Sequence, residues 1–410
     1  MDISLHRDRM NRRSLLRWGM LSLGLTAFPT ENLSAAFPVP LQVGGRAEGE
    51  LYEGKGLGGG GQLDVRLTVN PHGDPDLVEV WQRMRPFSFD SWVEEWTRVA
   101  EKNEKLAERF DKDGRPVTAS EYFLRAATFY QNACWPQPES DPRMLPTYHK
   151  MMEVANQAYR LVPPPFEHVE IPYEGSTLAS YFSKPRGAAG QRFPVIYAYG
   201  GADSAIYGGG GGSFVARGMA YLAVDGPGQG GSLRLKRLYA PPDSERVGKA
   251  VIDYLVTRPD VDPNRIGITG TSMAGYAAPR CASGDKRIRA CAANSCAYSL
   301  LEDIFDYFPP IQERIRWLIG ARDMADARKK IAEFTMEGRA SLIECPLLIG
   351  YSKDDRIMDP QGAFRLYQAA VHSKREMVEG IGHNHPTRVG GPNPLRPPAI
   401  EDFMAKHLFG

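Results

Sequence analysis

A serine lies in a run of small residues, Gly-Thr-Ser-Met-Ala-Gly, at positions 270–275. The run follows an apolar stretch that predicts a strand over Ile266–Thr269, and it precedes a stretch with helical spacing. A sharp strand-to-helix turn of this kind exposes a serine for attack on a carbonyl carbon, provided that the residues two positions before and after it are small. Gly270 and Ala274 meet that demand, so Ser272 is the candidate nucleophile.

A nucleophilic serine needs an acid and a histidine, and after such a turn they follow in that order. Asp354 and Asp355 come after an apolar run at Leu347–Gly350, and His383 lies in a glycine-flanked loop after a run at Glu376–Glu379. The histidine would take the serine proton and return it to the leaving group, while the carboxylate would hold the imidazole in the right tautomer. Each piece alone could belong to a surface turn, but their joint occurrence predicts a catalytic triad.

The two adjacent aspartates cannot both face the histidine, because neighbouring side chains diverge. A catalytic aspartate is usually followed, three positions on, by an apolar residue that packs under the sheet. That residue is Ile357 for Asp354 and Met358 for Asp355. Ile357 also follows an arginine, Arg356, which resembles the pattern of prolyl-oligopeptidase-type enzymes, and this resemblance leads us to expect Asp354 as the triad acid.

The oxyanion of the reaction needs hydrogen-bond donors from two places. One is the N–H of Met273, the residue after the nucleophile. The other lies after an apolar run that ends at Tyr199, where the N–H of Gly201 or Ala202, or the Tyr199 hydroxyl, could donate. Tyr199 could equally be a core aromatic at the end of a strand.

Short apolar runs separated by helical stretches predict the elements that position these residues. The first two form a hairpin-like pair, and the later ones alternate with helices, as Arg246–Thr257 does before Ile266. Alternation of this kind predicts an α/β fold with a doubly wound, mainly parallel sheet and helices on both faces. The predicted strands are Val169–Tyr173, Leu178–Phe182, Val195–Tyr199, Ala220–Asp225, Ile266–Thr269, Ile288–Ala293, Leu347–Gly350 and Glu376–Glu379.

Two helical segments flank or interrupt this pattern. Residues 76–165 predict an N-terminal helical cap in front of the catalytic domain at 166–410, and residues 299–343 predict a helical lid insert. Within the cap, Thr118 and Glu121 have the spacing of a capping box that opens a helix. Aromatic residues in the cap and lid could contact an apolar or aromatic substrate, or they could only pack helices together; they are Trp92, Trp96, Tyr122, Phe308 and Trp317.

The composition excludes several other classes of protein. The chain has 410 residues, is 42% hydrophobic and carries a net charge of +1, so it can fill a large core and lacks the basic excess of a nucleic-acid-binding protein. Five cysteines without a C-x-x-C pair are neither a disulfide scaffold nor a zinc ribbon. His383 and His385, two positions apart, are a weak metal signal. We expect a small-molecule substrate and a possible homodimer, with no cofactor, metal, nucleic acid or stable membrane insertion.

The N-terminal segment has the pattern of an export signal. Arg12 and Arg13 precede Ser-Leu-Leu and a short apolar run, as in a twin-arginine signal, and small residues follow near position 36. We expect residues 1–36 to be this signal, with Met10 as a possible true start, and the mature protein to be periplasmic or secreted. An amphipathic N-terminal helix is the other interpretation. Residues 37–75 are rich in glycine and proline and predict a linker.

Further motifs carry a resemblance to a known family. The sequence Asp-Gly-Pro-Gly-Gln-Gly at 225–230, together with the serine turn, resembles the α/β-hydrolase superfamily. More narrowly, it is similar to the group that contains 2,6-dihydroxypseudooxynicotine hydrolase, the fermentation-respiration switch protein and fungal polyketide-shortening hydrolases. Residues 122–130 and 169–175 are also similar to that group, and the resemblance covers residues 76–410. It implies that Ser272, His383 and one of the two aspartates form the triad under a helical cap.

The sequence departs from the group's pattern at two places. Ala274 stands where glycine is usual, and alanine is still small. Tyr199-Gly200-Gly201 is closer to prolyl-oligopeptidase-type enzymes, in which a strand-end tyrosine helps to form the oxyanion hole and the first of two aspartates is catalytic. The resemblance also implies that a residue near Asp203 could touch the substrate.

These observations predict a serine-dependent hydrolase that forms an acyl-enzyme on an ester or amide of a small apolar or aromatic substrate. Cleavage of a carbonyl-flanked C–C bond is implied only by the resemblance. Two alternatives remain open at this point: a prolyl-oligopeptidase-like aminopeptidase, and a non-catalytic binding protein with the same fold.

Overall fold

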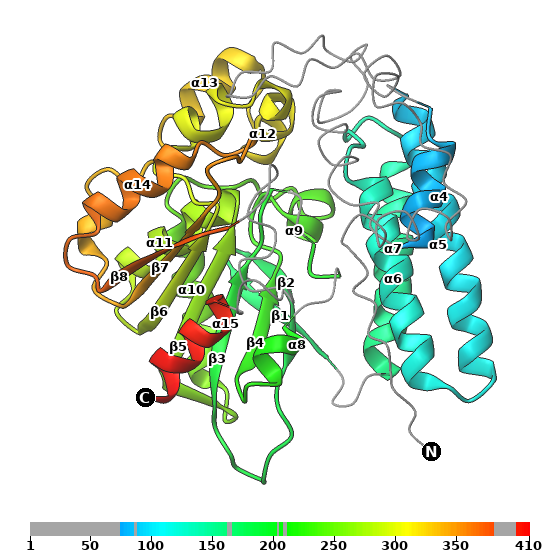
Figure 1. The fold of residues 1–410 in the computed structure, drawn as a ribbon, viewed down its shortest axis with the longest axis horizontal. Coiled ribbons are helices and arrows are strands. Elements are labelled where there is room, and N and C mark those ends of the chain that lie inside the picture. The colour runs from blue at the N-terminus through cyan, green and yellow to red at the C-terminus, as the bar shows by residue number, and fades with distance from the viewer. Residues whose placement is uncertain (1–73, 86–87, 162–165, 203–204, 208–210, 381–398) are drawn as a thin grey trace, which may run out of the picture. The chain divides into compact units, whose positions relative to one another are not determined.

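The computed structural model describes residues 74–410, except for 86–87, 162–165, 203–204, 208–210 and 381–398. Its centre is an eight-stranded sheet in the order β1-β2-β4-β3-β5-β6-β7-β8 (Figure 1). β1 pairs with β2, and β2 with β4, in antiparallel fashion, whereas every later pair is parallel. The strands are β1 (Glu167–Tyr173), β2 (Ser176–Ser183), β3 (Phe193–Tyr199), β4 (Ala220–Val224), β5 (Val261–Thr271), β6 (Ile288–Asn294), β7 (Leu347–Tyr351) and β8 (Arg375–Glu379).

Helices cover both faces of the sheet because its strands are apolar on both sides. Val195 and Tyr197 of β3 belong to one buried cluster, which includes α10 (Ser244–Thr257) and α11 (Met273–Gly284). Ile196, between them, belongs to another cluster with residues of α15 (Ala399–Phe409). Successive residues of a strand point to opposite faces, so this division is what a doubly covered sheet requires. The predicted α/β-hydrolase fold and all of its predicted strands are confirmed.

The N-terminal helices pack around a second buried cluster. Trp92 is its anchor: the side chain is 3% exposed, and its indole N–H donates to the carbonyl oxygen of Asn132 at 2.8 Å. Trp96 lies beside it and packs against Phe129. The helices are α4 (Pro75–Arg83), α5 (Phe89–Lys112), α6 (Pro116–Cys134) and α7 (Met144–Leu161).

The predicted capping box at Thr118 is wrong. α6 begins two residues earlier, with Pro116 in its first turn, and the preceding Arg115 makes no side-chain capping bond. Proline suits the first helical position because its fixed φ is already helical and it lacks an N–H that would have no partner there. The local proline signal therefore outweighs the Thr118–Glu121 spacing.

Short helical pieces fill the segment between β6 and β7. A π-helix at Leu301–Asp306 and 3₁₀ turns at Pro309–Ile311 and Ala340–Leu342 flank α12 (Gln312–Leu318) and α13 (Met324–Ile331). The segment is thus helical, as the sequence predicts.

Side-chain contacts join the N-terminal helices to the rest of the chain. The Tyr159 hydroxyl of α7 donates to the carbonyl oxygen of Ile206 at 3.1 Å, in the loop after β3. The guanidinium of Arg314 in α12 donates to the carbonyl oxygen of Trp135, at the end of α6. Within the part of the chain that the structure describes, we find no helix with the length and apolar character needed to cross a membrane.

We predict that Trp92→Ala destabilises the helical segment by about 3–5 kcal/mol, because it leaves a large cavity and removes the partner of the Asn132 carbonyl. Denaturant unfolding followed by tryptophan fluorescence and circular dichroism measures this. Glu101→Ala, at an exposed position of the same helix, is the control and should change the unfolding midpoint little. Equal midpoints for the two variants would contradict the role given to Trp92.

Candidate active site

Ser272 lies between β5 and α11 with a backbone geometry that L-residues rarely adopt. Its φ is 65° and its ψ is −127°. Such a conformation costs on the order of 1–3 kcal/mol and persists only where the surroundings enforce it. Here the Ser272 N–H donates to the carbonyl oxygen of Asn294 in β6 at 3.1 Å, and the Gly275 N–H donates back to the carbonyl oxygen of Ser272 at 2.7 Å. The backbone thus turns sharply and is held from both sides.

Small residues make this turn possible. A Cβ on Gly270 would overlap the carbonyl oxygen of Ala274, and a Cβ on Gly275 would lie 2.7 Å from the carbonyl oxygen of Asn294. Strand and helix therefore approach as closely as the sequence predicts for an exposed nucleophile. The methyl group of Ala274 fits in this turn because Gly270 opposite has no side chain.

The helix after the serine supplies hydrogen-bond donors. α11 begins at Met273, directly after Ser272, and the first N–H groups of a helix have no acceptor within the helix itself. They also carry the positive end of the helix dipole, which favours developing negative charge. Met273 is therefore in the position that an oxyanion donor needs.

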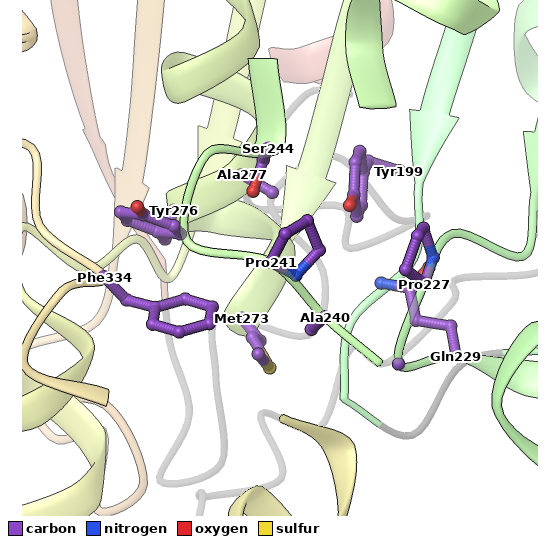
Figure 2. Close-up of a pocket in the computed structure, with 11 residues that line it drawn as sticks. Tyr199, Pro227, Gln229, Ala240, Pro241, Ser244, Met273, Tyr276, Ala277 and Phe334 are labelled. Atoms are coloured by element: carbon purple, nitrogen blue, oxygen red, sulfur yellow. The ribbon is translucent and has the colours of Figure 1, made fainter. Parts of the chain in front are cut away.

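A small pocket opens beside this helix start, and Figure 2 shows the side chains around it. It joins Met273, after β5, to Tyr199, at the end of β3. Most of its wall is apolar, with few polar groups, as in sites for small organic molecules. Its lining residues are Tyr199, Pro227, Gly228, Gln229, Ala240, Pro241, Ser244, Met273, Tyr276, Ala277 and Phe334.

Tyr199 is buried, and its ring packs against Gly226. Burial raises the pKa of its hydroxyl well above the usual value, so the group stays protonated and able to donate. The next residues are held by Gln229, whose side-chain amide donates to the carbonyl oxygen of Gly200 and accepts from the N–H of Gly226 at 3.0 Å. Gly201 and Ala202 follow in this loop, so all three candidate second donors lie at or just after the end of β3.

The structure distinguishes the two aspartates sharply. Asp354 is exposed, whereas Asp355 is buried with 3% of its surface accessible. One carboxylate oxygen of Asp355 accepts the N–H groups of Ile357 at 2.9 Å and Met358 at 3.0 Å, and the other accepts the Ser295 hydroxyl at 2.6 Å. Asp355 thus has a fixed orientation, and Asp354 has the surroundings of a surface turn.

The loop with Asp355 is fixed from the lid side as well. The Tyr307 hydroxyl, next to the π-helix, donates to the backbone carbonyl of Asp355 at 2.9 Å. Asp303, fully buried in the π-helix, is paired with Arg365 of α14 (Pro360–Ala369). The π-helix and the residue after it therefore hold the chain at the acid and at α14, which follows it.

His383, His385 and Asp203 lie outside the described residues. The prediction that His383 is the base therefore stays a prediction, as does a substrate contact near Asp203. The described residues contain no group of three or more histidines, cysteines, aspartates or glutamates placed to hold a metal ion. Cys291 and Cys296 are both buried and free.

Asp225, the first residue of the Asp-Gly-Pro-Gly-Gln-Gly motif, organises the loops around the pocket. Its carboxylate accepts the N–H of Ile206 at 2.9 Å and that of Gly231 at 2.8 Å, and the Tyr148 hydroxyl lies 3.4 Å from one oxygen. Burial raises the pKa of Asp225 to about 6, although the two N–H donors oppose the rise. Gly230 is required beside it, because a Cβ there would overlap the carboxylate.

A comparison with protein families identifies the group to which this fold and turn belong. Residues 78–308, more than half of the chain, match the family described as FrsA-like esterases. The chain belongs to the FrsA-like esterase family. The enzyme is therefore an α/β-hydrolase, and the group suggested by the sequence motifs is confirmed.

Individual relatives agree with this assignment. The chain is 27% identical to a hydrolase named LUC6 from Fusarium over 327 residues, which cover 68% of this chain and 77% of that protein. It is 26% identical to the 20-hydroxy-prefusarin hydrolase FUS2 of Gibberella moniliformis over 326 residues, with coverage of 68% and 77%. The crystal structure of 2,6-dihydroxy-pseudo-oxynicotine hydrolase shares the fold, with a TM-score of 0.70, 23% identity and coverage of 84% of this chain and 95% of that one.

Several residues of the site were not found from the sequence. Pro241, Ser244 and Phe334 line the pocket but come from loops and a helix start with no motif of their own. Ser295, which orients Asp355, has no sequence signal either, although it directly follows β6. Tyr276 follows Gly275 directly, and only the turn motif before it could have drawn attention to it.

We predict that Gly270→Ala disrupts the turn, because its methyl group would overlap the carbonyl oxygen of Ala274. The expected result is a clear drop in melting temperature together with loss of labelling at Ser272 by a fluorophosphonate. Gly212→Ala, at a glycine where a Cβ would meet no atom within 4 Å, is the matched control. Wild-type stability and labelling in Gly270→Ala would contradict the close approach described above.

Proposed function

We propose that this esterase-family enzyme hydrolyses a small carbonyl substrate with Ser272 as the nucleophile and His383 as its base. Ser272 attacks the carbonyl carbon, the leaving group takes the proton from the histidine, and water then releases the acyl group. The observation that carries this proposal is the enforced φ of 65° at Ser272, at the junction between a central strand and a helix. A glycine would adopt this conformation at no steric cost, so the presence of serine there calls for a chemical reason.

For the acid, burial and hydrogen bonding favour Asp355 over the Asp354 of the sequence prediction. A triad carboxylate must stay ionised and hold one orientation towards the imidazole. Asp355 has three donors, from Ile357, Met358 and Ser295, that fix its two oxygens. We therefore propose Asp355 as the residue that orients His383.

The oxyanion would be stabilised by the N–H of Met273 and by a second donor from the end of β3. Tyr199 is supported by its place in the same pocket as Met273 and by the raised pKa that keeps its hydroxyl protonated. The N–H of Gly201 is the other candidate. Either donor meets the charge only when the carbonyl oxygen becomes negative, which is how such groups lower the barrier.

The substrate would be small and largely apolar at the reacting end. Met273, Ala277 and Phe334 contribute apolar surface to the pocket. The bond that the enzyme cleaves would be an ester or amide bond, or a C–C bond flanked by carbonyls. The relative named 20-hydroxy-prefusarin hydrolase supports a substrate that resembles prefusarin. We also propose export through the twin-arginine-like N-terminus, on the residues at positions 12–16.

Activity-based labelling tests the proposal. We expect a fluorophosphonate to label the wild-type enzyme and leave Ser272→Ala unlabelled, with turnover of aryl esters lower by up to ~10⁶-fold in the variant. Ser213→Ala, at an exposed serine of the same catalytic domain, is the control and should label normally. Normal labelling of a folded Ser272→Ala protein would show that the nucleophile lies elsewhere.

Two asparagine variants test the assignment of the acid. We predict that Asp355→Asn lowers kcat by up to ~10⁴-fold, because the amide favours the wrong imidazole tautomer, and that Asp354→Asn changes it little. The two single variants are assayed side by side on one aryl ester, with melting curves to confirm folding. If Asp354→Asn is inactive and Asp355→Asn retains activity, the acid is Asp354, as the sequence spacing predicts.

A further inference from the structure

Arg234 lies where the N-terminal helices, the lid and the catalytic domain meet. It is the last residue of α9 (Gly230–Arg234), and its guanidinium lies 5.4 Å from the centre of the Tyr148 ring and 5.2 Å from that of Trp317. The side chain is half-buried, and its Nε is fully buried. Rings from α7 and α12 therefore hold a partly desolvated cation between them.

The Arg234 guanidinium has no strong acceptor among the described residues. Among the described residues its guanidinium has a weak acceptor in the Cys134 thiol but no carboxylate ion pair, and its buried Nε has no partner. Other half-buried arginines differ: Arg258 is paired with Glu167 and Asp260, and Arg280 with Glu245. A buried donor without an acceptor costs about 1–3 kcal/mol, and more when it is charged, so such a group calls for a function.

A second buried polar group without a partner lies in the adjacent turn of the helical segment. Gln137 is fully buried, and neither the nitrogen nor the oxygen of its amide has a hydrogen-bond partner in the structure. Its backbone N–H donates to the carbonyl oxygen of Cys134 at 3.1 Å. The charge of Arg234 acts on the Cys134 thiol, where it opposes the rise in pKa caused by burial. Cys134 thus links the guanidinium, through its thiol, to the turn that holds the Gln137 backbone.

This junction borders the pocket beside the nucleophile turn. Gln229 lines the pocket, and Arg234 follows it on α9, about 7 Å farther at the rise of an α-helix. On the other side, the carbonyl oxygen of Leu318, next to Trp317, accepts the N–H of the pocket residue Ala240 at 2.9 Å. The chain segments that carry Arg234 and Trp317 therefore both start at the pocket wall.

We propose that Arg234 and Gln137 form a subsite that binds a carboxylate group carried by the substrate. The proposal rests on the hydrolase function above and adds the substrate class, a carboxylate-bearing ester or amide. A guanidinium binds a carboxylate through two parallel N–H···O bonds, and the Gln137 amide adds a further donor. The flanking rings of Tyr148 and Trp317 fit a planar group next to that carboxylate.

The charge of this site suits a ligand group with a single negative charge. One guanidinium and one neutral amide balance the one negative charge of a carboxylate, whereas a phosphate dianion calls for more positive charge. The charge of Arg234 opposes the rise that burial causes in the pKa of Asp225, but no hydrogen bond joins the two side chains, because the Asp225 oxygens accept the N–H groups of Ile206 and Gly231 and face Tyr148. A neutral substrate would leave the guanidinium without a strong acceptor.

Binding of a matched pair of probes to the full-length protein tests the subsite without turnover. The probes are 3-phenylpropanoate and its neutral amide, titrated by calorimetry at pH 7. We expect the wild type to bind the acid at least ~10-fold more tightly, as for charge-assisted hydrogen bonds. Arg234→Gln should remove this preference, and Arg234→Lys should lower it because an ammonium lacks the planar fork. Arg237→Gln is the control, since Arg237 is exposed and carries the same charge three residues away.

Gln137→Met provides an independent arm in case Arg234→Gln does not fold. We expect it to raise the melting temperature, because a buried amide without partners is replaced by an apolar side chain of similar size, and to weaken binding of the acid severalfold. A lower melting temperature with unchanged affinity for the acid would overturn the role of Gln137. Equal affinity of the wild type for acid and amide, or an unchanged preference in Arg234→Gln, would overturn the subsite.

These outcomes are separable from a failure of the proposed reaction. Fluorophosphonate labelling of Ser272 reports the nucleophile and does not depend on a carboxylate. A wild-type protein that is labelled but shows no preference for the acid retains the hydrolase function and loses the subsite. A protein that prefers the acid but is not labelled at Ser272 retains the subsite and loses the proposed nucleophile.

Discussion

The conformation of one residue, Ser272, constrains the centre of the enzyme. A positive φ at serine is sustained only if the chain before and after it is held in place, and that requires β5 to pair with β6 and α11 to start at once. Both requirements restrict positions 270 and 275 to glycine, because neither has room for a Cβ. The strained conformation is thus maintained by the pairing of parallel strands in a sheet that is covered on both faces. The same packing that stabilises the fold fixes the direction in which the hydroxyl is presented.

A buried carboxylate, Asp225, performs a comparable task for the loops. It lies directly after β4 and accepts N–H groups from the loop after β3 and from α9. Removing a charge from water raises its pKa to about 6, and two backbone donors offset part of that cost. Because the loop after β3 also carries the candidate oxyanion donors, the motif at 225–230 is linked to chemistry through backbone geometry. Its carboxylate orients the loops that line the pocket and need not touch the substrate to do so.

The fold was largely predictable from the sequence, and the reason is periodicity. Strands buried on both faces are continuous apolar runs, so each of the predicted strands appears in the sheet, although β5 begins at Val261 and not at Ile266. The position at which a helix begins was harder to predict. Thr118 has a capping pattern, but Pro116 determines where α6 begins. Spacing alone also could not separate Asp354 from Asp355. Their difference comes from tertiary contacts with Ser295 and Tyr307, which belong to the segment after β6.

The aromatic residues illustrate why the rest of the site could not be predicted. Trp92 and Trp96 pack within the helical segment, and the pocket is lined by residues such as Pro241 and Ser244 that carry no pattern. Trp317 is different, because it faces the guanidinium of Arg234 across a junction of three parts of the chain. A cation between rings is stabilised without a counter-ion, but its buried Nε still lacks an acceptor. Two features of Arg234 depend on the folded structure and cannot be recognised in the sequence. Its guanidinium is held between two aromatic rings, and its buried Nε has no hydrogen-bond partner. That combination distinguishes a group placed to bind a ligand from one that only stabilises the fold.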